Sequence, residues 1–262
     1  MIARTLSVAV LVAALLASPT TSRAEGDLAQ FGYQQRPGNQ LPLDAVLLDE
    51  TGQQVRLGAV IGPRPAILAL GYFDCPNLCG LLRADLTDAL AGSGLHAPAD
   101  YSLIVLSIDP DETAVDAAGA HRQDATRMPM PAEAAAWHYL TGGADAVRAI
   151  EQAVGFRARF DPALRQFLHP AGLVILTSRG VVSSYLLGVG YRPGDLRAAV
   201  TQAGEGGVAK AALPVLLLCF HFDPTTGRYT LAVTRLLQLA GGLTVLTIGG
   251  TIALALRRER QR

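Results

Sequence analysis

Two uninterrupted apolar runs limit what this chain can fold into more than any other feature of its sequence. Ala66–Gly71 reads AILALG, and Ser102–Ile108 reads SLIVLSI. Strands that are apolar on both faces are typical of sheets that helices cover on both sides. We therefore predict two buried strands at the centre of a sheet.

The segments around these runs complete an alternating order of strands and helices. Helices are predicted over Leu78–Leu90, Asp111–Arg127, Ala144–Val154 and Asp195–Ala203, a short strand over Trp137–Leu140, and hairpins over 44–57 and 172–186. Such alternation indicates a central sheet with helices packed on it. The expected class is α/β, compatible with a thioredoxin-like sandwich, although periodicity alone does not choose this fold over other α/β folds.

The first 24 residues have the pattern of a secretory signal peptide. Arg4 precedes the apolar run Leu6–Ala17, and Ser22-Arg23-Ala24 places small residues at −3 and −1 of a cleavage site. An uncleaved N-terminal anchor is the alternative. Residues 25–40 are then an extended lead-in to a domain over 41–205.

A second apolar run, Leu236–Leu256, is long enough to cross a membrane. Its 21 residues carry no charge and would span about 30 Å as a helix. The arginines of 257–262 are expected to stay cytoplasmic. We therefore expect a juxtamembrane segment at 206–230, a transmembrane helix at 231–256 and a basic tail. The domain would be anchored in the inner membrane and face the periplasm; a buried core helix is the alternative.

The charge balance restricts the kinds of partner. The chain has 22 basic and 22 acidic residues, so it lacks the basic surplus that nucleic-acid binding requires. Without the six arginines of the two ends and Glu259, 16 basic residues face 21 acidic ones, a net charge near −5. This charge does not suit nucleic acid or anionic lipid as a partner of the exported domain.

Three cysteines, Cys75, Cys79 and Cys219, are an odd number for a structural disulfide framework. A free thiol is costly in an oxidising compartment unless it is used. Cys75 and Cys79 lie at a predicted strand-to-helix junction, where backbone N–H groups and the helix dipole favour thiolate. Such a pair can close a reversible disulfide or bind a soft metal ion.

The spacing and a distant histidine favour metal binding. Dithiol oxidoreductases usually have a C-x-x-C motif, and the extra residue here lets both sulfurs converge on an outside ion. His169 enters the last hairpin 90 residues after Cys79, so its loop can lie at the same sheet edge. Two thiolates and an imidazole suit Cu(I), with Cu(II) possible, whereas a structural zinc site normally has a fourth protein ligand.

These segments resemble the Sco/SenC family. The resemblance is carried by Cys75-Pro76-Asn77-Leu78-Cys79, Ser107–Thr113 with its Asp109-Pro110 pair, and His169 before a hairpin strand, and it covers 41–203. It implies a membrane-tethered thioredoxin-like protein that binds copper through Cys75, Cys79 and His169. The implied role is assembly of the copper centre of cytochrome c oxidase, whose copper-centre subunit would be the partner.

The sequence departs from the family pattern at three places. Gly80 replaces the proline that usually follows the second cysteine, Pro170 follows His169, and the predicted membrane span is C-terminal rather than N-terminal. We interpret the chain as a divergent branch.

Other functions remain open. Cys75 and Cys79 can be the redox-active pair of a thiol-disulfide oxidoreductase that keeps acceptor cysteines reduced, with His169 tuning their pKa. A scaffold or sensor in oxidase assembly is a third hypothesis. A fixed Cys75–Cys79 disulfide is a further alternative, although closing so short a loop gains little stability. We expect a metal-delivery protein rather than an enzyme.

Residues beside the predicted site have two interpretations each. Asp109 caps the following helix or orients the site, and Asp74 is a solvated loop residue or tunes copper affinity. Phe73 is expected to pack. Cys219 and His221 either form a second soft ligand pair, or Cys219 is a small buried hydrophobe.

The remaining histidines, His96, His121 and His138, have no cysteine or acid pattern around them. We expect them to be ordinary surface or half-buried residues.

Overall fold

A computed structural model of the chain describes residues 32–75, 79–129, 131–210, 222–223, 228–229 and scattered positions between 241 and 258. The predicted signal peptide, Cys219, His221 and most of Leu236–Leu256 lie outside these residues.

Contacts divide the chain into two compact units, Met1–Ala209 and Lys210–Arg262. In the second unit, β12 (Phe222–Asp223) pairs antiparallel with β13 (Arg228–Tyr229). No helix within the described residues has the length and apolar character that crossing a bilayer requires.

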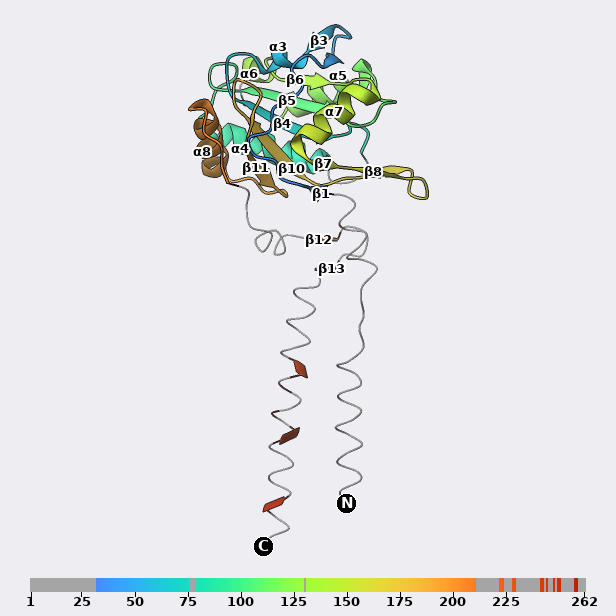
Figure 1. Cartoon of the computed structure of the whole chain (residues 1–262), viewed down its shortest axis with the longest axis vertical. Coiled ribbons are helices and arrows are strands. Elements are labelled where there is room, and N and C mark those ends of the chain that lie inside the picture. The colour runs from blue at the N-terminus through green and yellow to red at the C-terminus, as the bar shows by residue number, and fades with distance from the viewer. Residues whose placement is uncertain are drawn as a thin grey trace. The chain divides into compact units, whose positions relative to one another are not determined.

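A five-stranded mixed sheet forms the centre of the first unit, in the order β11-β10-β4-β5-β6 (Figure 1). The strands are β4 (Ala66–Gly71), β5 (Ser102–Ser107), β6 (His138–Leu140), β10 (Gly172–Leu176) and β11 (Val182–Leu187). β4, β5 and β6 are parallel, and β10 runs antiparallel to both β4 and β11. The sequence predicted all five strands to within two residues at either end.

Helices cover both faces of this sheet, as the α/β pattern predicted. The helices are α3 (Leu57–Ile61), α4 (Cys79–Ser93), α5 (Ala114–Ala125), α6 (Pro131–Ala134), α7 (Ala144–Val154) and α8 (Pro193–Gly204). One apolar cluster joins the sheet to α4, α5 and α8, and another joins it to α3 and α7. Side chains of β4 alternate between them, with Ile67 and Ala69 in the first cluster and Leu68 and Leu70 in the second.

Three small hairpins or strand pairs surround the central sheet. The predicted hairpin is β2 (Val46–Leu48) with β3 (Gln54–Arg56). The pairs β1 (Gly32–Tyr33) with β7 (Phe156–Arg157) and β8 (Arg159–Asp161) with β9 (Gln166–Leu168) were not predicted. Their strands are only two or three residues long, too short for an alternating pattern to stand out.

The turn after α7 depends on Gly155. This residue ends the helix at the predicted position with φ +67°, in the left-handed region that favours glycine. A Cβ at this position would lie 1.9 Å from the carbonyl oxygen of Gln34. The chain can therefore pass close to the lead-in and enter β7, the start of the segment that ends at His169.

The start of α5 corrects one prediction. The helix was expected from Asp111, but it begins at Ala114, with Thr113 as its N-cap. The Thr113 backbone N–H donates to the Asp116 carboxylate at 2.8 Å and the Asp116 backbone N–H donates to the Thr113 side chain, which together form a capping box. The acidic residues before Thr113 therefore belong to a turn, and one of them, Glu112, has another role.

Candidate metal centre

The pairing of β4 with β10 brings His169 toward the cysteine segment. In this antiparallel pair Leu173 lies opposite Ala69. Continuing the register past the end of β4 places His169 beside the loop that leaves Gly71. The imidazole ring of His169 lies 5.7 Å, centroid to centroid, from the ring of Tyr72. Two segments nearly a hundred residues apart therefore meet at one sheet edge, as the sequence predicted.

The two cysteines follow on this same loop. Cys75 is half-buried and packs against the apolar cluster that contains Tyr72, against which Phe167 of the His169 segment also packs. Cys79 is the first residue of α4, so its backbone lies at the helix N-terminus. Its side chain and residues 76–78 are outside the described part of the chain. The predicted three-ligand geometry therefore stays a prediction.

Aromatic rings hold the imidazole of His169 on two sides. Tyr72 meets it edge-on at 73°, and the ring of Phe156 lies 6.0 Å away. Nδ1 of His169 is 3.1 Å from the carbonyl oxygen of Pro170. In the neutral tautomer that makes this hydrogen bond, Nδ1 donates and the lone pair is on Nε2, which is the form that a metal ligand needs.

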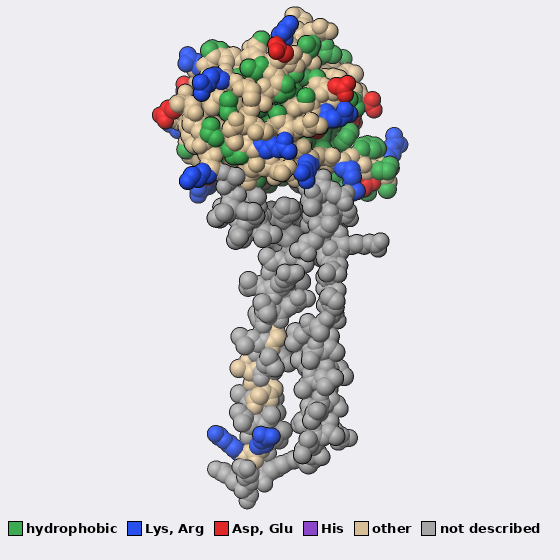
Figure 2. Space-filling view, viewed as in Figure 1, with side chains coloured by type: hydrophobic (Ala, Val, Ile, Leu, Met, Phe, Trp, Pro, Cys, Tyr) green, Lys and Arg blue, Asp and Glu red, His purple; other side chains and the backbone are tan. Residues whose placement is uncertain are grey.

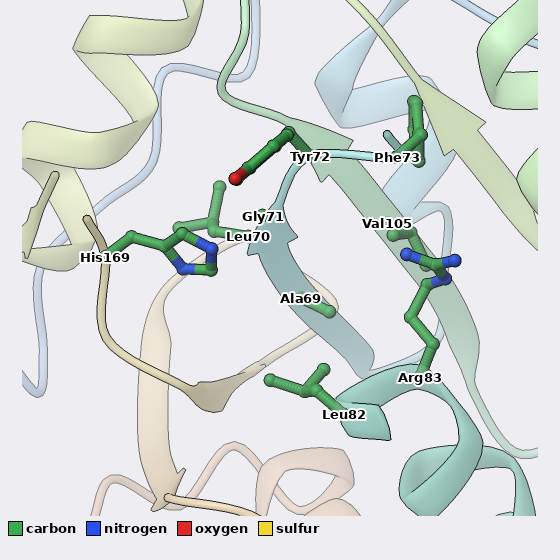
Figure 3. A pocket seen from close by; sticks show the side chains of 9 residues that line it. All are labelled: Ala69, Leu70, Gly71, Tyr72, Phe73, Leu82, Arg83, Val105 and His169. Carbon is green, nitrogen blue, oxygen red and sulfur yellow. The ribbon is translucent and has the colours of Figure 1, made fainter. Parts of the chain in front are cut away.

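A cavity lies beneath the loop and has His169 at its edge (Figure 3). It holds about 20 Å³, room for about one water molecule. Tyr72 and His169 lie toward one end and Arg83 of α4 toward the other. The site therefore has apolar walls and one buried cation nearby.

Glu112 is the functional residue that the sequence analysis missed. Its carboxylate accepts hydrogen bonds from the backbone N–H groups of Phe73, at 2.9 Å, and Asp74, at 2.7 Å. The Ser107 hydroxyl also donates to it. Burial raises the pKa of Glu112, while these hydrogen bonds oppose the rise. The acid-rich turn after β5 was the available signal, but the sequence does not show which of its carboxylates turns inward.

Phe73 packs as expected, whereas Asp109 does not cap the following helix, which was one of the two roles considered for it. The ring of Phe73 packs 6.1 Å from that of Tyr139, and Asp74 is exposed. The Asp109 carboxylate accepts the N–H of Asp111 at 2.9 Å. Asp109 therefore closes the turn before α5, whose N-cap is Thr113.

Glu151 of α7 is a second acidic group near the histidine. Burial raises its pKa to about 7, against the opposing charges of Arg148 and His169. It lines a separate cavity of about 310 Å³ together with Arg148, Ala158 and Phe167. Glu151 is therefore poised to change charge near neutral pH beside the segment that ends at His169.

The β8–β9 hairpin leads directly into His169 and presents apolar side chains to solvent. Phe160 and Leu164 are about half exposed, and hydrophobic side chains gather at this projection on the right of Figure 2. Phe160 packs edge-on against Phe167, with ring centroids 5.2 Å apart. The hairpin thus extends the apolar surroundings of the candidate site to the surface.

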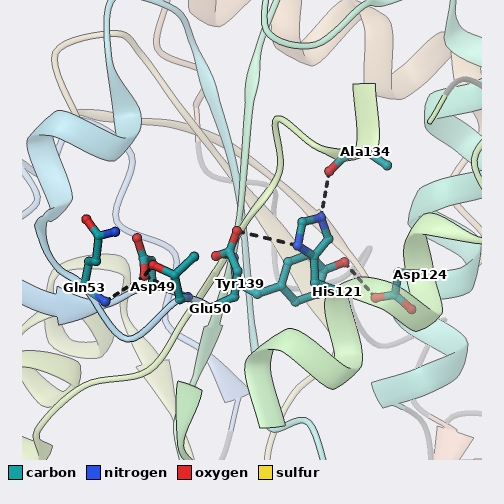
Figure 4. Close-up of polar contacts among 8 residues, drawn as sticks. Asp49, Glu50, Gln53, His121, Asp124, Ala134 and Tyr139 are labelled. Carbon is teal, nitrogen blue, oxygen red and sulfur yellow. Dashed lines mark hydrogen bonds and ion pairs between the residues drawn. The ribbon is translucent and has the colours of Figure 1, made fainter. Parts of the chain in front are cut away.

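His96, His121 and His138 lie outside the candidate site and have contacts of their own. His121 stacks on Tyr139, its Nε2 lies 2.7 Å from the Ala134 carbonyl oxygen, and its Nδ1 lies 3.6 Å from the Glu50 carboxylate (Figure 4). His96 pairs with Glu133 at 2.7 Å. Burial lowers the pKa of His138. Among the described side chains, which do not include that of Cys79, no three His, Cys, Asp or Glu are grouped as a metal ion would require.

Comparisons with known proteins identify the fold. No protein-family model matches the sequence, and no curated protein matches it. A putative electron transfer protein from Aquifex aeolicus VF5 superposes with a TM-score of 0.58 at 22% identity, over 65% of this chain and 95% of that one. An SCO1/SenC family lipoprotein from Bacillus anthracis str. Ames gives 0.53 at 13% identity, over 66% and 99%.

A third similar structure is that of Arabidopsis thaliana ScoI with copper bound. It superposes with a TM-score of 0.50 at 15% identity, over 64% of this chain and 98% of that one. At these identities the likeness establishes the fold. The chain has the mixed α/β architecture of Sco/SenC structures, so the predicted resemblance is confirmed at the level of the fold.

Proposed function

We propose that this chain is a copper metallochaperone whose metal ligands are Cys75, Cys79 and His169. The observation that carries the proposal is the β4–β10 register, which brings the His169 segment to the loop that leads into Cys75. The donor set supports copper, because two thiolates and one imidazole are soft ligands that suit Cu(I). The copper-bound Arabidopsis protein of the same fold is consistent with this cargo.

The surroundings of the site support tight but exchangeable binding. Tyr72 and Phe156 contact the imidazole, and Cys79 is the first residue of α4, a position at which backbone N–H groups favour thiolate. Copper would leave by stepwise ligand exchange, in which each acceptor ligand replaces one ligand of this chain. Because the thiols must lose their protons to bind, copper affinity should rise with pH.

We further propose the cellular setting from the sequence and the resemblance. The signal-like Leu6–Ala17 and the uncharged Leu236–Leu256 support export followed by tethering at the C-terminus. The Sco/SenC resemblance supports the copper-centre subunit of cytochrome c oxidase as the recipient of the metal.

Titration of the reduced full-length protein with Cu(I), in detergent and against a competing chelator, tests the proposal. Wild type should retain one copper ion per chain. Cys75→Ser, Cys79→Ser and His169→Ala should each weaken binding by more than the roughly 10–100-fold that the loss of an outer-shell partner costs. His96→Ala is the matched control and should bind as wild type does. Unchanged retention in Cys75→Ser would refute the assignment.

A thiol-disulfide oxidoreductase is the second candidate, supported by the same helix N-terminus at Cys79. It predicts that Cys75→Ser stops exchange with a test disulfide, whereas His169→Ala keeps much of that activity. Copper binding that is lost in His169→Ala while exchange persists would separate the two functions. Full exchange activity in a wild-type protein that retains no copper would favour the oxidoreductase.

A further inference from the structure

The segment that carries Cys75 is held by a side chain from the turn that follows the neighbouring strand β5. After β4 ends at Gly71, the backbone N–H groups of Phe73 and Asp74 both point toward Glu112. Each oxygen of the carboxylate accepts one of them, Oε2 from Phe73 and Oε1 from Asp74. Hydrogen bonds to an ionised acceptor are roughly twice as strong as neutral ones. This pair therefore restrains the Tyr72–Phe73 and Phe73–Asp74 peptide groups, one peptide bond before Cys75.

Glu112 is itself fixed at the end of β5. Its Oε2 accepts the Ser107 hydroxyl, and the Ile108 N–H donates to the Gly71 carbonyl oxygen at 2.7 Å, which extends the pairing of β4 with β5. The Glu112 carboxylate is thus anchored to the last residue of β5, whereas the loop that it holds has left the sheet. A rigid strand can in this way determine the position of a loop residue.

We propose that Glu112 is a positioning residue that presents Cys75 to copper before the metal arrives. The inference rests on the proposed function, because it takes Cys75 to be a ligand. Partial burial of the Glu112 carboxylate costs desolvation energy. The hydrogen bonds from the two loop N–H groups, together with that from Ser107, offset this cost. Without the carboxylate, these N–H groups would lose their acceptor, and Cys75 would sample positions away from the metal.

Glu112→Gln tests this role because it keeps the size of the side chain but removes its charge and one acceptor oxygen. In the reduced, metal-free, full-length protein, the amide protons of Phe73 and Asp74 should exchange with solvent about 10-fold faster, as expected for the loss of a hydrogen bond to a charged group. Cu(I) affinity should fall about 10-fold. Asp111→Asn, an exposed carboxylate on the same turn, should change neither quantity.

A second variant and the wild-type titration separate a failure of the Glu112 role from a failure of the proposed function. If Glu112→Gln does not fold, Ser107→Ala replaces it, because it removes one donor to Glu112 and should give smaller changes in the same direction. Unchanged exchange and affinity in the variant that folds would overturn the role of Glu112. A wild type that retains no copper would instead overturn the proposed function, and the wild-type titration alone would show it.

Discussion

His121 and His169 are both half-buried histidines that contact aromatic rings, yet their surroundings differ. His121 lies flat on Tyr139, at 11° and 4.8 Å, and contacts Glu50 and Ala134, which come from separate parts of the chain. His169 meets Tyr72 edge-on at the edge of a cavity, and its Nδ1 bonds the carbonyl of the next residue, Pro170.

These surroundings distinguish a histidine that stabilises the fold from one that is suited to bind a metal ion. The contacts of His121 join three segments and continue through Tyr139 to Asp124 and Arg83, a closed network in which most groups are buried. The hydrogen bond at Nδ1 of His169 joins the ring to the adjacent residue Pro170, and the ring contacts Tyr72 and Phe156. We therefore expect substitutions near His121 to affect stability, and substitutions near His169 to affect binding.

Breaking the buried ion pair of the His121 region should have the largest effect. Asp124→Ala leaves the buried guanidinium of Arg83 without its 2.7 Å partner and removes the acceptor of the Tyr139 hydroxyl. The free energy of unfolding should fall by about 3–5 kcal/mol. Urea unfolding followed by fluorescence of Trp137, the single and fully buried tryptophan, measures it.

The exposed pair of Arg56 with Asp44, at 3.0 Å, is the control for that experiment. Asp44→Ala should cost less than about 1 kcal/mol, because solvent screens this pair. Equal losses of unfolding free energy in Asp124→Ala and Asp44→Ala would contradict a larger contribution of the His121 region to stability.

Replacing each of the two histidines by alanine should affect a different property, stability for His121 and copper affinity for His169. His121→Ala removes the imidazole partner of the Ala134 carbonyl and of Glu50 and should cost about 1–3 kcal/mol of stability, with copper affinity unchanged. His169→Ala should cost less than about 1 kcal/mol but should lose tight copper binding. Unfolding curves measure the stability of both variants, and Cu(I) titrations measure their copper affinity. A variant that loses stability and copper affinity together would contradict the separate roles of the two histidines.

The pH dependence of stability should show a smaller effect that belongs to His121. Its hydrogen bond to Glu50 raises the pKa of His121 above the usual 6.5, and burial opposes the rise. The stabilisation that protonated His121 contributes to the folded state is therefore fully present below its unfolded pKa. It is lost as the pH rises through the folded pKa. The stability gap between wild type and His121→Gln should narrow as the pH rises above the unfolded pKa of about 6.5; a gap that widens would contradict the assignment. His138 is present in both proteins, so the burial that lowers its pKa is common to them, whereas the like charge of His121, which also lowers it, is lost in the variant.

Much of the fold could be predicted from the sequence, because the central elements have strong patterns. Ala66–Gly71 had to be buried on both faces, and α7 has its predicted bounds because Gly155 ends it. The strands of 156–168 were missed, since they are held by pairing with each other and with β1 rather than by a pattern of their own.

The candidate site was predictable in part. The cysteine segment follows β4, and His169 precedes β10, so a sheet in which these strands pair brings the two segments together. Glu112 could not be selected from the acid-rich turn, because its role depends on the direction of one side chain toward the Phe73 and Asp74 amides. Residues outside the described part, including Cys219 and His221, stay predictions.

X-ray absorption of the copper-loaded, reduced protein tests the central claim most directly, because it counts the atoms bound to the metal. Two sulfur neighbours at about 2.3 Å and one nitrogen neighbour at about 2.0 Å, by analogy with zinc, are expected. Cys219→Ser should give the same spectrum, and His169→Ala should lose the nitrogen. A wild-type spectrum with only nitrogen or oxygen neighbours, or one that His169→Ala leaves unchanged, would contradict a site made of Cys75, Cys79 and His169.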